Sequence, residues 1–151
     1  MNVLSTAPSD WQLIAEGGAN LVLSYSGNDA AFSSLVLRVR KRKLHAVFTS
    51  EDDEDPAVAF NEQVVEQLMP GLSASLWNAT VDEAFLQALA ELVEPHRRPA
   101  RRLEDELDTK RKRVVLAEDL VSPRSGEKVL TVEIKVVSRT LCIEYAAEMV
   151  L

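Results

Sequence analysis

Residues 11–27 read WQLIAEGGANLVLSYSG, and residues 35–40 read LVLRVR. Apolar and β-forming residues dominate 11–15, 21–25 and 35–40, with alternation in the first and third segments that is typical of strands. Glycine-containing turn signals separate the segments at 16–20 and 26–29. The first forty residues therefore predict a three-stranded antiparallel meander.

The rest of the chain predicts helices followed by further strands. Asp55-Pro56 favours a helix start, and apolar residues continue at helical spacing until Pro70. Thr80 begins a capping-box pattern for a second helix that ends near Pro95. We expect both apolar stripes to pack in the core, residues 96–112 to form a charged connection, and 113–120 and 129–137 to form strands. This order predicts an α+β domain with a mainly antiparallel sheet and two or more helices.

Composition bounds the class of protein. The chain has 151 residues, 17 Lys+Arg and 24 Asp+Glu, which gives a net charge of −7 and fits one domain. No apolar run approaches the roughly 20 residues that span a bilayer, and residues 1–10 lack a secretory signal pattern. Cys142 is the single cysteine, so an internal disulfide framework is excluded. We expect a nuclear or cytoplasmic protein with no membrane partner.

Most basic residues fall in three groups, at 38–43, 97–102 and 110–113. Each group is either a solvated surface segment or a face for a polyanion, and both nucleic acid and a highly phosphorylated small molecule fit the second interpretation. The acidic net charge and an aromatic content of 5% argue against nucleic acid, because single-strand binders offer stacking platforms.

The glycine turn is a candidate phosphate site. Backbone N–H groups of Gly17, Gly18 and Ala19 can converge on an anion, although an ordinary hairpin turn explains the same residues. The turn joins two strands, as the glycine loop of protein kinases does, and Arg38 on the third strand is placed to hold phosphate. Glu133 and Lys135 share one face of the last predicted strand, as a surface ion pair or as contacts to ribose and phosphate.

Several strings occur together in one order. EGGANLVL at 16–23 precedes VLRVRK at 36–41, and FNEQV at 60–64, RPARR at 98–102, LAEDL at 116–120 and VEIK at 132–135 follow. Over most of residues 10–137 the chain resembles the inositol-pentakisphosphate 2-kinase family.

The resemblance implies a kinase-like N-terminal lobe. Its enzyme would transfer the γ-phosphoryl group of ATP to the 2-hydroxyl of inositol 1,3,4,5,6-pentakisphosphate and form inositol hexakisphosphate, or phytate. Arg102 would bind the inositol phosphate. Mg²⁺ ligands and catalytic residues would lie in a C-terminal lobe, and the partners would be ATP and an inositol polyphosphate. The ATP-binding residues implied are Gly17, Gly18, Ala19, Asn20, Arg38, Glu118, Asp119, Glu133 and Lys135.

Two departures from the family pattern concern the end of the sequence. The family's E-x-K-P-K motif is EIKVV at 133–137, without the proline and the second lysine, and residues 138–151 do not resemble the family. An altered splice or gene-model boundary near Val136 would explain both. We expect an N-lobe-like domain at 1–137, a divergent tail at 138–151, no C-lobe, and little or no turnover by the isolated chain. The alternative is a non-catalytic module that binds a nucleotide or an inositol phosphate.

Overall fold

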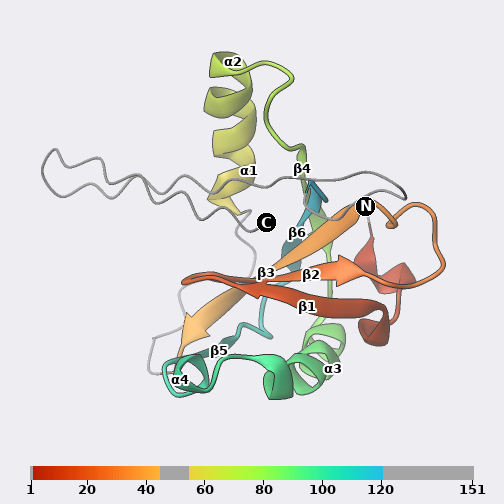
Figure 1. The fold of residues 1–151 in the computed structure, drawn as a ribbon, viewed down its shortest axis with the longest axis vertical. Helices are drawn as coiled ribbons and strands as arrows, with labels where there is room; N and C mark the ends of the chain where they lie inside the picture. Colours follow the sequence, from red (N-terminus) through yellow and green to blue (C-terminus); the bar gives the residue numbers. More distant parts are fainter. Residues whose placement is uncertain (1, 45–54, 121–151) are drawn as a thin grey trace, which may run out of the picture. The chain divides into compact units, whose positions relative to one another are not determined.

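The computed structural model describes residues 2–44 and 55–120 (Figure 1). The described residues up to 119 belong to one compact unit. The predicted strand at 129–137, with Glu133 and Lys135, and the predicted tail at 138–151 lie outside the described residues. Within the described ranges, no helix has the length and apolarity needed to cross a membrane.

The sheet begins with the predicted meander. Strands β1 (Trp11–Glu16), β2 (Asn20–Tyr25) and β3 (Leu35–Lys43) pair in sequence order, and every strand pair in the sheet is antiparallel. Strand β6 (Arg113–Glu118) adds to β3 and β4 (Leu76–Thr80) adds to β6, which gives the order β1-β2-β3-β6-β4. The short β5 (Asp105–Leu107) pairs with the far end of β3. The α+β prediction is confirmed.

Helix α3 (Glu83–Val93) supplies the helical part of the core. Its buried residues Phe85, Leu86 and Leu89 pack with strand residues such as Leu37 and Leu116. The helix starts two residues later than its capping-box pattern predicts. Asp82 is the N-cap, and its Oδ1 accepts a hydrogen bond from Phe85 N at 2.7 Å. Thr80 instead ends β4, where it pairs with Arg113, so strand pairing replaces the predicted cap.

The other predicted helix forms, but its apolar stripe does not pack as predicted. Segments α1 (Pro56–Phe60), η3 (Asn61–Val65, a π-helical stretch) and α2 (Glu66–Leu68) follow one another without a break. Among these described residues only Val58 is buried, whereas Phe60, Val64 and Leu68 are exposed. The prediction of core packing is wrong here, because α1 contacts β4 and the core against the sheet is formed with α3.

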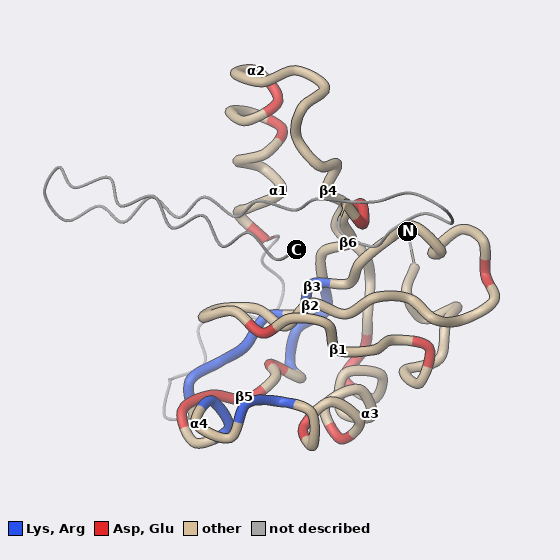
Figure 2. The backbone as a smooth tube through the Cα atoms, viewed as in Figure 1, with Lys and Arg blue, Asp and Glu red and all other residues tan. Residues whose placement is uncertain are grey.

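Residues 96–112 contain more structure than the predicted charged connection. The 3₁₀ turn η4 (Glu94–His96) follows α3, and α4 (Pro99–Arg102) and β5 come next. Two further 3₁₀ turns, η1 (Val3–Ser5) and η2 (Pro8–Asp10), precede β1. Charged segments of β3, α4 and β5 gather at one end of the sheet (Figure 2).

Asp55 both caps α1 and ties it to the sheet. Its Oδ1 accepts a hydrogen bond from Ala57 N at 2.9 Å, and Arg40 on β3 donates to both carboxylate oxygens, at 2.9 and 3.1 Å. Burial alone would raise the pKa of Asp55, but the hydrogen bonds from Arg40 and Ala57 outweigh it and hold this pKa below its ordinary value of 3.8. The bonds therefore stabilise α1 at neutral pH and weaken once the carboxylate is protonated.

We predict that Asp55→Asn lowers the free energy of local opening of α1 by about 1–2 kcal/mol at neutral pH. Amide hydrogen exchange at residues 57–60 measures this change. Because the folded pKa is depressed, the wild-type contribution is complete above the ordinary pKa of 3.8 and is lost as pH falls through the folded value. Exposed Glu62 in the same helix is the control, and Glu62→Gln leaves this exchange unchanged. Equal protection in wild type and Asp55→Asn would contradict the assignment.

Candidate functional site

The glycine turn is a tight hairpin between β1 and β2. Gly17 N donates to Asn20 O at 2.9 Å, and Ala19 O accepts from Lys41 N of β3 at 2.8 Å. The amides of Gly18 and Ala19 donate to no residue in the described part of the chain. The hairpin therefore uses the Gly17 amide to close itself and leaves two adjacent N–H groups for an anion.

The backbone of this hairpin does not itself require glycine at position 18. Among the described glycines only Gly71 has a positive φ, of 69°. A Cβ placed on Gly18 would meet no atom within 4 Å, and one on Gly17 would lie 3.6 Å from Asn20 O, an ordinary contact. The absent side chain at Gly18 thus leaves open space above the bare backbone, where a ligand can approach closely.

Arg38 lies at the centre of the sheet. It is aligned with Val22 on β2 and Val115 on β6, and its neighbour Leu37 belongs to the core with α3. Because side chains alternate along a strand, Arg38 lies on the opposite face from Leu37, between the two valines. It makes no hydrogen bond or ion pair with any residue of 2–44 or 55–120, although its charge contributes to the lowered pKa of Asp55. The result is a cation on an apolar part of the sheet.

Glu118 and Asp119 lie where β6 ends. Glu118 is aligned with Leu35 at the start of β3, and its Oε2 accepts from Ser75 N at 3.1 Å. Asp119 N donates to Ser34 O at 2.8 Å. Lys41, which bonds the hairpin, is six residues along β3 from Leu35, so the two ends of the candidate site are about 20 Å apart with Arg38 between them. This line suits an elongated ligand.

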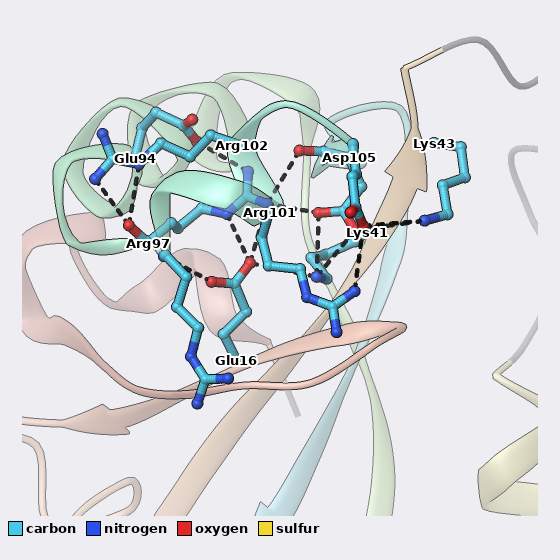
Figure 3. Close-up of polar contacts among 10 residues, drawn as sticks. Glu16, Lys41, Lys43, Glu94, Arg97, Arg101, Arg102 and Asp105 are labelled. Atoms are coloured by element: carbon cyan, nitrogen blue, oxygen red, sulfur yellow. Dashed lines mark hydrogen bonds and ion pairs between the residues drawn. The ribbon is translucent and has the colours of Figure 1, made fainter.

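A buried ion group lies directly beside the hairpin (Figure 3). Glu16 and Asp105 both accept from Lys41 Nζ, at 3.3 and 3.1 Å, and both accept from Arg97 Nη2, at 3.0 and 2.6 Å. No side chain of the four is more than 4% exposed. Glu94 adds a third carboxylate, which accepts from Arg97 Nη1 at 3.0 Å. Removing one member leaves a buried charge without its partner, which costs about 3–5 kcal/mol.

Hydrogen bonds keep Glu16 and Arg97 ionised. Burial alone would raise the pKa of Glu16, but hydrogen bonds from Arg98 N, Arg97 and Lys41 outweigh it and hold the pKa below its usual range. Burial works against the charge of Arg97 as well, and hydrogen bonds to Glu16 and Glu94 more than offset it, so its pKa is raised. Glu16 and Arg97 therefore act as a fixed pair of charges at neutral pH.

Arg102 lies on α4, next to the buried group. Its Nε and Nη2 donate to Arg97 O at 3.0 and 2.8 Å, and Nη2 also donates to Pro95 O at 2.9 Å. Carbonyl oxygens orient this guanidinium without neutralising its charge, and its Nη1 donates to no described residue. Arg102 is thus half-buried, held in place and still cationic.

The structure brings together part of the predicted site. The hairpin residues, Arg38 and Arg102 are connected through β3 and the buried group. Glu118 and Asp119 lie at the other end of β3. Glu133 and Lys135 are outside the described residues. Sequence reasoning missed the roles of Glu16, Lys41 and Asp105. The available signal was that the basic group at 97–102 is followed at once by acids at 104–108. Within residues 2–44 and 55–120, no cluster of three His, Cys, Asp or Glu side chains could hold a metal ion.

Comparison with known proteins gives one consistent family. A family model described as inositol-pentakisphosphate 2-kinase matches residues 14–136. Inositol-pentakisphosphate 2-kinases from two strains of Cryptococcus neoformans var. neoformans serotype D are each 30% identical to the chain over 134 residues. That alignment covers 86% of this chain and 32% of each relative, so the chain spans about a third of the length of these curated relatives. The chain belongs to the inositol-pentakisphosphate 2-kinase family.

Proposed function

We propose that this chain is the nucleotide-binding part of an enzyme that phosphorylates inositol 1,3,4,5,6-pentakisphosphate at the 2-hydroxyl to give inositol hexakisphosphate. Family membership supports the use of ATP. The observation that carries the proposal is Arg38, a cation without a hydrogen-bonding partner among the described residues, on the strand that also bonds the glycine hairpin.

The proposed ATP lies along β3. Its phosphates meet the N–H groups of Gly18 and Ala19 and the guanidinium of Arg38, because backbone amides and arginine are the groups that bind phosphate oxygens most directly. Its base lies toward Glu118 and Asp119, and the half-buried Val22 provides apolar surface between the two ends. Glu133 and Lys135 are proposed as further contacts to the nucleoside and to phosphate.

The inositol polyphosphate is proposed to bind at Arg102, through the Nη1 group that the carbonyls of Pro95 and Arg97 leave available. ATP supplies the phosphoryl group, and the described residues bind and orient the two ligands. The described residues offer no cluster of three His, Cys, Asp or Glu side chains that fits Mg²⁺. A binding module without turnover would use the same residues, so an assay of product formation separates the two functions.

Gly18→Ala is predicted to weaken ATP binding about fivefold or more, because the added methyl occupies the space through which phosphate approaches the backbone. The free energy of unfolding stays the same or rises by about 0.4–1 kcal/mol, since the position accepts a Cβ and alanine restricts the unfolded chain. Calorimetric titration and urea unfolding of the same samples give the two values. A weaker affinity that merely follows a loss of stability would contradict the proposed phosphate contact.

Arg102→Ala is predicted to weaken inositol hexakisphosphate binding about tenfold or more, the usual effect of losing a charge-assisted hydrogen bond. Arg101→Ala is the matched control, because Arg101 is an equally half-buried neighbour whose guanidinium is paired with Glu104, at 3.4 Å. Titration with the hexakisphosphate compares both variants with wild type. An equal loss in the two would indicate a general basic surface instead of a specific contact at Arg102.

The 151-residue chain, assayed alone with Mg-ATP and inositol 1,3,4,5,6-pentakisphosphate, is predicted to bind its ligands without forming the hexakisphosphate. It spans about a third of the relatives' length, and phosphoryl transfer also needs a group that positions the acceptor hydroxyl. A radiolabelled assay of product formation provides the measurement. Robust conversion by this chain would overturn the prediction and favour a complete catalytic site within it.

A further inference from the structure

Glu16 lies between the glycine hairpin and the segment that precedes α4. It is the last residue of β1, directly before the glycine hairpin. Its Oε1 accepts from Lys41 Nζ at 3.3 Å and from Arg97 Nε and Nη2 at 3.1 and 3.0 Å. Its Oε2 accepts from the backbone N of Arg98 at 3.0 Å. One carboxylate therefore joins the hairpin's strand, β3 and the residue that precedes α4.

These contacts resist separate movement of the glycine hairpin and the segment that contains α4. The Glu16 side chain is 4% exposed and that of Arg97 is fully buried, so water has little access to replace either partner. If α4 shifted away from the end of β1, the buried carboxylate of Glu16 and the buried guanidinium of Arg97 would lose their hydrogen bonds to each other, which is strongly unfavourable. We therefore expect residues 16–20 and 97–102 to move as one body.

The connection continues from Glu16 to Arg102. Arg97 and Arg98 hold the carboxylate of Glu16, and the Arg97 carbonyl accepts two hydrogen bonds from the Arg102 guanidinium, at 3.0 and 2.8 Å. A ligand that immobilises Arg102 therefore restrains the backbone of Arg97, and through Glu16 it restrains the hairpin.

We propose that Glu16 is a positioning residue that couples the polyphosphate contact at Arg102 to the glycine hairpin. This inference rests on the proposed function, because it needs ATP at the hairpin and an inositol polyphosphate at Arg102. Ordering the shared segment with one ligand lowers the entropy that the second ligand must remove, so each ligand tightens the other. The effect is reciprocal, because a coupling free energy belongs to both sites equally.

The test uses the whole 151-residue chain and the variant Glu16→Gln. Glutamine keeps the shape of the side chain, removes its charge, and replaces one acceptor oxygen with an NH₂ group, which cannot accept the hydrogen bonds from Arg97 or from Arg98 N. We expect saturating inositol hexakisphosphate to tighten ATP binding to wild type about fivefold or more. In Glu16→Gln this ratio falls close to 1, while each ligand alone still binds. Glu83→Gln makes the same chemical change at an exposed ion pair with Lys110 and keeps the wild-type ratio.

Hydrogen exchange on wild type tests the same coupling without any variant, so the result does not depend on whether Glu16→Gln folds. Adding inositol hexakisphosphate without ATP is expected to slow amide exchange at residues 17–20 as well as at 97–105. Protection confined to 97–105, or a ratio in Glu16→Gln equal to that of wild type, overturns the role of Glu16 and leaves the proposed function standing. Failure of both ligands to bind wild type instead contradicts the proposed function, and the coupling with it.

Discussion

The buried set of Glu16, Lys41, Arg97 and Asp105 is the constraint on which this part of the molecule depends. Two cations and two anions balance one another in the interior, where an uncompensated charge would be prohibitive. The four residues come from β1, β3, the segment before α4, and β5, so satisfying them brings together parts of the chain up to 89 residues apart in sequence. Apolar packing alone is not directional, whereas this hydrogen-bonded set permits one arrangement of these segments.

The same constraint explains how a short polar segment folds at all. Helix α4 has four residues and β5 has three, too few to be stable by themselves. Residues 97–105 carry many charges that would ordinarily favour solvent. Arg97 offsets the cost of burying this segment, because its guanidinium donates hydrogen bonds to Glu16, Glu94 and Asp105. These bonds hold the segment against the end of the sheet. Arg102 then bonds back to the carbonyls that precede it, and the glycine hairpin and α4 become neighbours by way of Glu16.

Local hydrophobic patterns in the sequence correctly predicted the elements whose apolar side chains pack in the main core. The meander and α3 have alternation or helical spacing, β6 is a short continuous apolar run, and apolar residues from all of them form one cluster. Periodicity failed in two instructive ways. The stripe of Phe60, Val64 and Leu68 indicates a helix correctly, but a stripe does not say which surface covers it, and the main core is formed with α3. Strand β5 has no apolar alternation, since Asp105 is buried by ion pairing, and the order of charges in sequence does not say which opposite charge meets it in space.

The pairing of charges within the chain determines which cations remain available at the candidate site. Although the chain is acidic overall, most described basic side chains are neutralised within it: Arg40 by Asp55, Lys41 and Arg97 by Glu16 and Asp105, Arg42 by Glu106, Arg101 by Glu104, Lys110 by Glu83 and Arg111 by Asp108. These paired acids thus act as structural counterions. Arg38 and the side chain of Arg98 make no hydrogen bond or ion pair with residues 2–44 or 55–120, and Arg102 is held by carbonyls alone. Positive charge therefore remains beside the glycine hairpin, on the strand and the helix that the buried group fastens to it, which is where phosphates would need it.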